Sequence, residues 1–278
     1  SCPNNKYYEW RFGKIRYIKK GSGSPVLLLH DLTPGSSSYE FSAIIDELAE
    51  KHEVYAIDFL GYGLSDKPNI TYTNYLYVQS VIDFIKVIIG RKTSIIATGD
   101  AAPIGIMACH NDGEVIDKIL LLNPQSINKL NQIPNKQTRL LKFLIDTPIL
   151  GTLLYNIQTT KESFKKVFLE EYFEESVNVK EEMLMSYVEA SHLPDFNAKF
   201  SFASFTGRYM NANIIHALKE IDHSIYILYG KSKKDIETVV DNYIYFNQSI
   251  EAFGIENTKH LCHLEAPSKV MEQINILL

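Results

Sequence analysis

The sequence predicts an α/β protein with a doubly wound, mostly parallel sheet and an inserted helical cap. Short, continuously apolar runs are typical of strands buried on both faces of a sheet, and helical stretches separate these runs in the first 125 residues. This alternation favours a parallel sheet with helices on both faces. It stops after residue 125 and resumes with one more apolar run near residue 225.

The expected strands follow the chain in a regular order. Residues 7–18 alternate aromatic and polar side chains before a Gly-Ser-rich turn at 19–24, which indicates a strand pair. Buried strands are expected at residues 25–30, 54–58, 93–97, 119–123 and 225–229.

The expected helices lie between and after these strands. Residues 39–49 place Phe41 and Leu48 on one apolar face, behind serines that can cap the helix. Further helices are expected at residues 75–89, at 103–109 and after Pro267. The second and third of these begin with proline or directly after it, and proline is tolerated in a first helical turn.

Three segments describe the expected domain organisation. Residues 1–125 form the first part of the core, 126–222 form the helical cap, and 223–278 complete the core. The middle segment is helical in pattern and has apolar clusters that include Phe143, Leu150 and Phe168. We expect side chains of this kind to line an apolar pocket under the cap.

The composition of the chain limits the kinds of partner that we expect it to bind. The chain has 278 residues, of which 45% are hydrophobic, and a formal net charge of -5 with interspersed signs. No basic surface for nucleic acid is indicated, so a small-molecule partner is expected. The three cysteines, Cys2, Cys109 and Cys262, lack the spacing of a metal site or a disulfide framework.

No apolar run reaches the length of a membrane span and no signal peptide is visible. The chain begins at Ser1 without a methionine. We therefore expect a cytoplasmic protein or, if a signal or anchor precedes Ser1, a membrane-associated extracytoplasmic one. Membrane contact is expected only through such a segment, and the sequence predicts no oligomeric state.

Two motifs resemble those of the α/β-hydrolase family. The run from Asp58 to Pro68 matches the pattern Asp-x-x-Gly-x-Gly-x-Ser-x-x-Pro, and the run from His260 to Pro267 matches His-x-x-x-x-Glu-x-Pro. The resemblance implies that His260 is the general base of a catalytic triad. In that family the chain order is nucleophile, acid, histidine. Ser65 is expected to hold its loop together.

The segment His30-Asp-Leu-Thr33 stands where the family has a His-Gly-x loop. The resemblance implies that the backbone N–H of Leu32 is one donor of an oxyanion hole, the pair of N–H groups that stabilises a tetrahedral intermediate. Asp31 replaces the usual glycine.

The nucleophile turn is present only as Gly99-Asp-Ala-Ala-Pro103, and three registers stay open. Ala101 is favoured as the nucleophile position, because small residues then surround the tip; Ala102 would supply the second oxyanion N–H. In the second register Asp100 is the nucleophile, as in haloalkane dehalogenases and epoxide hydrolases. In the third register Gly99 is at the tip and the site has no nucleophile.

The triad acid is the least clear member. The family places an aspartate in a Gly-x-x-Asp stretch after the strand at 225–229, and here Lys233 stands at that position. Asp235, two residues further on, is the expected acid.

The resemblance implies a carboxylic ester hydrolase that acts on a small apolar ester, with Ala101 in place of its serine. The exchange would be either an engineered knockout or a natural loss, and this chain would be nearly inactive. The alternatives are a dehalogenase-like or epoxide-hydrolase-like enzyme that uses Asp100, and a non-catalytic ligand-binding protein. None of these mechanisms needs a metal or an organic cofactor.

Overall fold

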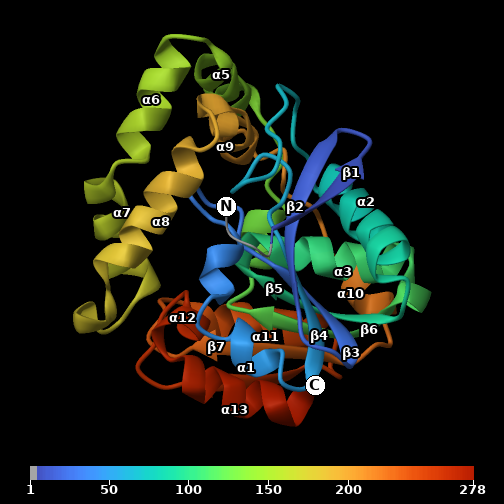
Figure 1. Cartoon of the computed structure of the whole chain (residues 1–278). Helices are drawn as coiled ribbons and strands as arrows, with labels where there is room; N and C mark the ends of the chain where they lie inside the picture. The colour runs from blue at the N-terminus through green and yellow to red at the C-terminus, as the bar shows by residue number, and fades with distance from the viewer. Residues whose placement is uncertain (1–4) are drawn as a thin grey trace.

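The computed structural model describes residues 5–278, apart from the side chain of Phe196. An eight-stranded sheet in the order β1-β2-β4-β3-β5-β6-β7-β8 forms its centre (Figure 1). The β1–β2 and β2–β4 pairs are antiparallel and all other pairs are parallel. The strands are β1 Lys6–Trp10, β2 Gly13–Lys20, β3 Ser24–Leu29, β4 His52–Ile57, β5 Thr93–Thr98, β6 Ile116–Leu122, β7 Ile225–Gly230 and β8 Glu251–Ile255.

Helices cover both faces of the sheet. Because successive side chains of a strand point to opposite faces, Leu27 and Leu29 of β3 pack in one core and Val26 and Leu28 in the other. The first core is closed by α2 Asn74–Phe84, η2 Ile85–Ile89, α3 Ala102–Asn111, α10 Ile215–Glu220 and α11 Ile236–Phe246. The second is closed by η1 Ser38–Phe41, α1 Ile45–Leu48, α12 Cys262–Glu265 and α13 Pro267–Leu277. The predicted doubly wound α/β fold is confirmed.

Apart from the short η3 Gly99–Ala101 and η4 Gly113–Val115, the remaining helices lie between β6 and β7, in the segment expected to form the cap. Figure 1 shows α5 to α9 gathered to the upper left of the sheet. The segment consists of α4 Ile127–Leu130, α5 Lys136–Asp146, α6 Leu150–Gln158, α7 Lys161–Val167, η5 Phe168–Tyr172, η6 Ser176–Asn178, α8 Glu181–His192, η7 Phe196–Ala198 and α9 Lys199–Thr206, followed by α10. The last helix, α10, packs on α3 and α11 of the core.

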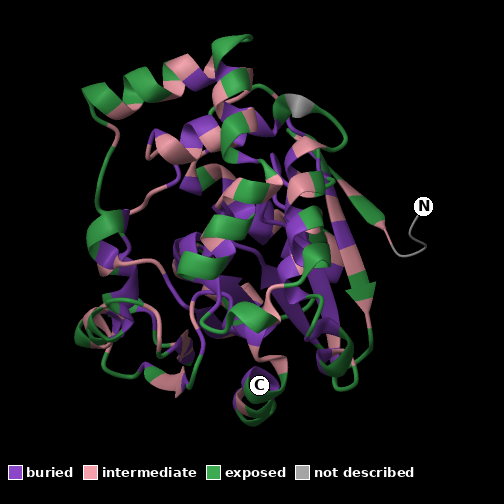
Figure 2. Cartoon of the chain, turned by 90° about the vertical axis from the view of Figure 1, so that its left-hand side faces the viewer, coloured by how far each residue is buried: buried purple, intermediate pink, exposed green. Residues whose placement is uncertain are grey.

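The apolar side chains of the cap do not all face inward. Phe168 belongs to a buried cluster that includes Leu261 and Leu264 of the core, so this part of the cap is docked beside the expected catalytic histidine. Phe143 and Leu150 differ from the expectation, because they are 65% and 44% exposed. Figure 2 shows exposed ribbon along the outer cap helices.

The loop after β4 has the role expected of its polar residues. The Ser65 hydroxyl donates to the carbonyl of Asp58 at 2.6 Å and accepts from the N–H of Arg16 at 2.8 Å. Gly63 has a φ of 51°, and a Cβ there would overlap the Asp58 carboxylate. These contacts close the loop on itself, which explains why Ser65 is buried away from any substrate.

Three elements differ from the sequence prediction, among them α11 Ile236–Phe246, for which no helix was expected. The helix expected at residues 39–49 is divided into the short elements η1 and α1. The edge strand β8 was not anticipated, because its five residues are mostly half-buried and lack a continuous apolar run.

The cysteines and the membrane test complete the description. Cys109 and Cys262 are buried free thiols, and Cys2 lies outside the described residues. Within residues 5–278 no single helix has the length and hydropathy to cross a membrane. By those two criteria one bent pair would pass, formed by α5 and α6, whose axes differ by 98°.

Candidate active site

The turn that leads from β5 into α3 has Gly99 at its tip. Gly99 follows the last residue of β5 directly and has a φ of 54°, in the left-handed region that favours glycine. Ala101 has ordinary right-handed helical angles, φ -81° and ψ -12°, and is completely buried. A nucleophile elbow places its nucleophile on the sharp strand-to-helix turn itself. The expectation that Ala101 stands at the tip is therefore wrong, and the register with Gly99 at the tip is the one adopted.

The carboxylate of Asp31 occupies the space beside this tip. Asp31 Oδ1 accepts hydrogen bonds from the N–H of Leu32 at 2.7 Å and from the N–H of Asp100 at 2.9 Å. Asp31 Oδ2 accepts from Nε2 of His260 at 2.5 Å. A Cβ built on Gly99 would lie 2.7 Å from Asp31 Cγ, closer than carbon atoms approach. A nucleophile side chain at the tip and the Asp31 side chain thus exclude each other.

The two converging N–H groups are those of Leu32 and Asp100. Leu32 was expected to supply one donor, and its N–H does point into the site. Ala102 was expected to supply the second, but its N–H donates to the carbonyl of Gly99. The expectation for Ala102 is therefore wrong; it followed from the displaced register of the turn.

His260 lies between a carboxylate and an ammonium group. Lys233 Nζ donates to Nδ1 of His260 at 2.7 Å, opposite the contact with Asp31. With Lys233 as an ammonium, which only donates, and Asp31 as a carboxylate, which only accepts, the imidazole holds its proton on Nε2 and is neutral. Burial and the charge of Lys233 agree with this, because together they lower the pKa of His260.

Asp235 does not reach His260. It is exposed, it precedes α11 with a φ of 58°, and the nitrogen that an acid would contact is bonded to Lys233. The expectation that Asp235 is the triad acid is therefore wrong. The side chain at position 233, where the resemblance places the family's aspartate, is the one that meets the histidine.

Two neighbouring carboxyl groups have opposite pKa shifts. Burial alone would raise the pKa of Asp31, but the hydrogen bonds from His260 and the two N–H groups outweigh it and hold that pKa at about 2. Burial and the negative charge of Asp31 raise the pKa of Asp100 to about 7. At neutral pH the site therefore contains one firmly ionised carboxylate and one carboxyl group that is partly protonated.

The side chain of Asp100 contacts Gln125, whereas the backbone N–H of Asp100 contacts Asp31. Asp100 Oδ1 accepts from the amide of Gln125 at 3.1 Å, and 8% of the residue is exposed. Asp100 stands one residue after Gly99, on the first turn that continues into α3. It is close to the Asp31–His260 pair without occupying the nucleophile position.

Asn123, which directly follows β6, holds two of these loops together. Its amide nitrogen donates to the carbonyls of Lys259 and His260, at 3.0 and 2.7 Å, and its oxygen accepts from the N–H of Gly230 at 3.0 Å. This role of Asn123 was not predicted from the sequence. The signal was present, since a polar residue that ends a buried strand lies at the carboxyl edge of a parallel sheet, where sites form.

We expect Asn123→Ala to destabilise the protein by about 3 kcal/mol, because three buried partners would lose their hydrogen bonds. Urea unfolding followed by circular dichroism measures this. Asn131→Ala is the matched control, since Asn131 is exposed and should change the free energy of unfolding by less than about 0.5 kcal/mol. Equal effects of the two variants would contradict the role assigned to Asn123.

A small cavity adjoins the site at the junction of core and cap. Leu32, Tyr62, Tyr155 and Phe202 are among its lining residues, and its volume of about 10 Å³ has room for roughly one water molecule. The Tyr62 hydroxyl donates to the carbonyl of Leu32 at 2.6 Å. Aromatic side chains thus form part of the cavity wall beside Leu32.

Comparison with solved structures shows the same fold in other proteins. A serine hydrolase involved in carbazole degradation has a TM-score of 0.77 with this chain at 18% identity, covering 98% of this chain and 96% of that one. An epoxide hydrolase has a TM-score of 0.77 at 19% identity, covering 97% and 96%.

Curated relatives match over shorter segments. A 2-hydroxy-6-oxo-6-(2'-aminophenyl)hexa-2,4-dienoic acid hydrolase of Metapseudomonas resinovorans is 33% identical over 113 residues, which cover 39% of this chain and 38% of the relative. A cis-3-alkyl-4-alkyloxetan-2-one decarboxylase of Shewanella oneidensis is 23% identical over 205 residues, covering 70% and 59%. The matches thus span less than two thirds of either relative. The model of the alpha/beta hydrolase family, in contrast, matches residues 26–273, and the chain therefore belongs to that family.

Proposed function

We propose that this protein binds a small ligand at the Asp31–His260 site and does not form a covalent acyl-enzyme. The observation that supports this most directly is the Asp31 carboxylate, which accepts from both converging N–H groups beside a glycine tip. A carboxylate in that place resembles the oxyanion that such donors stabilise in a hydrolase. The protein's own side chain thus takes the place of the reacting group.

Three departures from a serine hydrolase act together. Gly99 offers no nucleophile, Asp31 blocks the N–H donors, and Lys233 replaces the acid that would stabilise a histidinium. Covalent acyl transfer needs all three functions. A serine introduced at Ala101 would lie behind the tip, so we do not expect Ala101→Ser to restore ester hydrolysis.

The ligand we propose is small and largely apolar, with one hydrogen-bonding group. Aromatic and aliphatic residues line the cavity beside Leu32, and the hydroxyl of Ser201 lies among them. The cavity is too small for an organic molecule, so binding requires the cap to move outward. The named relatives are, by their names, enzymes of small organic compounds, which agrees with this ligand class.

A binding experiment with p-nitrophenyl butyrate as the probe tests the proposal. We expect calorimetric binding without hydrolysis faster than that of His260→Ala. Ala190→Trp should abolish binding, because Ala190 lines the cavity on α8. Met185→Trp, on the same helix but 38% exposed, is the matched control and should bind normally. Hydrolysis that depends on His260, or binding unchanged by Ala190→Trp, would refute the proposal.

A second candidate is acid–base catalysis without an acyl-enzyme. The opposite pKa shifts of Asp31 and Asp100 favour it, since paired groups with separated pKa values commonly divide the roles of base and acid. Release of diol from styrene oxide and of chloride from 1-chlorobutane tests it. Turnover that is lost in Asp100→Asn would support this candidate over a purely binding role.

A further inference from the structure

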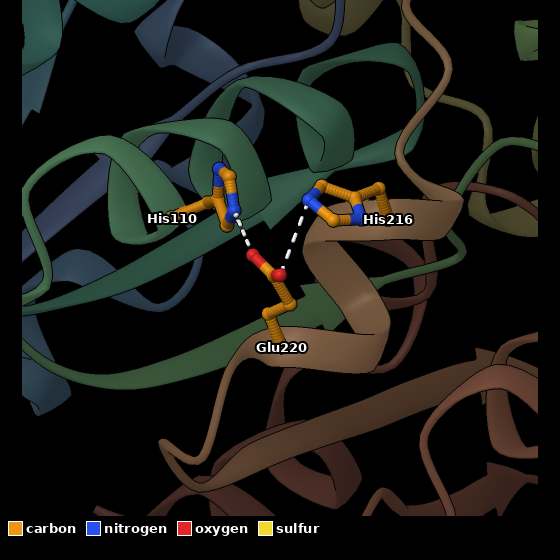
Figure 3. Close-up of side chains that lie close together, drawn as sticks. All are labelled: His110, His216 and Glu220. Atoms are coloured by element: carbon orange, nitrogen blue, oxygen red, sulfur yellow. Dashed lines mark hydrogen bonds and ion pairs between the residues drawn. The ribbon is translucent and has the colours of Figure 1, made fainter.

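A cluster of two histidines and a glutamate lies outside the candidate active site. His110 stands near the end of α3, and His216 and Glu220 stand on α10 (Figure 3). His110 Nε2 is 2.7 Å from Glu220 Oε2, and His216 Nε2 is 3.2 Å from Glu220 Oε1. One ligand atom from each residue lies within 4.8 Å of the others. Two helices thus direct three donor groups to one point on the surface.

These donors suit a borderline divalent cation. Imidazole nitrogen and carboxylate oxygen together bind Zn²⁺, Ni²⁺ and Cu²⁺, whereas Mg²⁺ and Ca²⁺ prefer oxygen ligands alone. The i,i+4 spacing places His216 and Glu220 on one face of α10. Zinc–ligand bonds of about 2.0–2.1 Å place neighbouring ligand atoms of a tetrahedral site about 3.3 Å apart. Small side-chain rotations bring the cluster to that spacing.

We propose that His110, His216 and Glu220 form a surface site for a borderline divalent cation such as Zn²⁺. Three protein ligands leave further coordination positions open to water or to an external ligand. The alternative interpretation is that the cluster forms two exposed ion pairs, which contribute little to stability. The two interpretations predict different results, because only a cation site makes the stability of the protein depend on added metal.

The location gives the cation a structural consequence. His110 lies at one end of α3, and the turn with Gly99 and Asp100 precedes the other end. A bound cation would link α3 to α10, away from the candidate active site. Because it would bind the folded chain in preference to the unfolded one, it would stabilise the fold by mass action.

The test uses the full chain, stripped with EDTA and dialysed, with ZnCl₂ as the probe. Calorimetry should give one Zn²⁺ per chain, and the melting temperature should rise by several degrees at about a 100-fold excess over Kd. MgCl₂ should cause no shift. His216→Ala and Glu220→Gln should each weaken Zn²⁺ binding at least tenfold. His223→Gln, outside the cluster, should bind as the wild type does.

His216→Ala is the most informative variant, because the His216 side chain is 76% exposed and its loss should leave the fold intact. Circular dichroism checks that intactness, and Glu220→Gln provides an independent test. Wild-type protein that shows neither heat nor a thermal shift with Zn²⁺ overturns the proposal. A thermal shift with Zn²⁺ that is as large in His216→Ala and Glu220→Gln as in the wild type also overturns the proposal.

Discussion

Rebuilding three positions should create an esterase from this chain. We expect the triple variant Gly99→Ser, Asp31→Gly, Lys233→Asp to hydrolyse p-nitrophenyl butyrate at least about 100-fold faster than the wild type. Asp31→Gly frees the two N–H groups and removes the overlap with a side chain at position 99. Lys233→Asp places a carboxylate where Nδ1 of His260 now meets an ammonium. The new serine would stand at the tip of the turn, which is the position that the chemistry requires.

The control differs from the triple variant by one oxygen atom. Gly99→Ala combined with the same two substitutions keeps the backbone change and the open N–H pair but lacks the hydroxyl. Its rate should stay at the wild-type level, as should that of Ala101→Ser alone. The left-handed backbone at position 99 costs about 1–3 kcal/mol with any side chain, so both triple variants should be equally destabilised. Equal rates for the serine and alanine versions would show that the tip is not the nucleophile position.

Asp100→Asn should stabilise the protein at high pH and not at low pH. The pKa of Asp100 is about 7 in the folded chain, against its ordinary value of 3.8. The folded chain therefore holds a proton that the unfolded chain releases, and the free energy of unfolding falls as the pH rises from 4 to 7. A difference of about three pH units corresponds to on the order of 4 kcal/mol. An asparagine avoids this loss, because it stays neutral at every pH.

Urea unfolding of the wild type and Asp100→Asn at pH 4, 6 and 8 measures the effect. Asp31 and His260 both have lowered pKa values, so each contributes stability that is lost as the pH falls. The difference between the two proteins at each pH removes these contributions. In an Asp31→Asn background the gain at pH 8 should shrink, since the charge of Asp31 is one cause of the raised pKa. A gain that is constant from pH 4 to pH 8 would contradict the titration of Asp100.

The site contains a pair of carboxyl groups that lowers the stability of the fold at neutral pH. A buried carboxyl group beside a buried carboxylate lowers stability at neutral pH, and Asp31 and Asp100 are such a pair. Proteins retain destabilising arrangements mainly where function needs them. The retained pair of carboxyl groups favours the proposed binding or acid–base role over a site without any function.

Much of the fold could be predicted from local patterns. Continuous apolar runs identify the parallel strands, since a strand covered by helices on both faces must be apolar throughout. The motifs that end at Pro68 and Pro267 indicate the family. Their residues are required by the local conformation of single loops, so they can be recognised without the rest of the chain. His260 and Leu32 each have a fixed distance from a recognisable strand or motif, and in the structure both contact the Asp31 carboxylate.

The register of the Gly99 turn could not be predicted in this way. Small residues at 99, 101 and 102 satisfy the local demand in more than one register. Strand pairing decides between them: Ala97 lies opposite Leu29 and Thr98 opposite Leu122, so β5 ends immediately before Gly99.

The sequence by itself determined the α/β architecture, the family and the position of the histidine, because each depends on a pattern within a short stretch of chain. Only the tertiary structure decided what surrounds that histidine. Asp31 lies 229 residues from it in the chain, and Asn123 lies 137 residues away. Contacts of this kind depend on how the ends of separate strands come together at one edge of the sheet. No local pattern encodes the Asp31 carboxylate that accepts from the N–H groups of Leu32 and Asp100 and contacts His260.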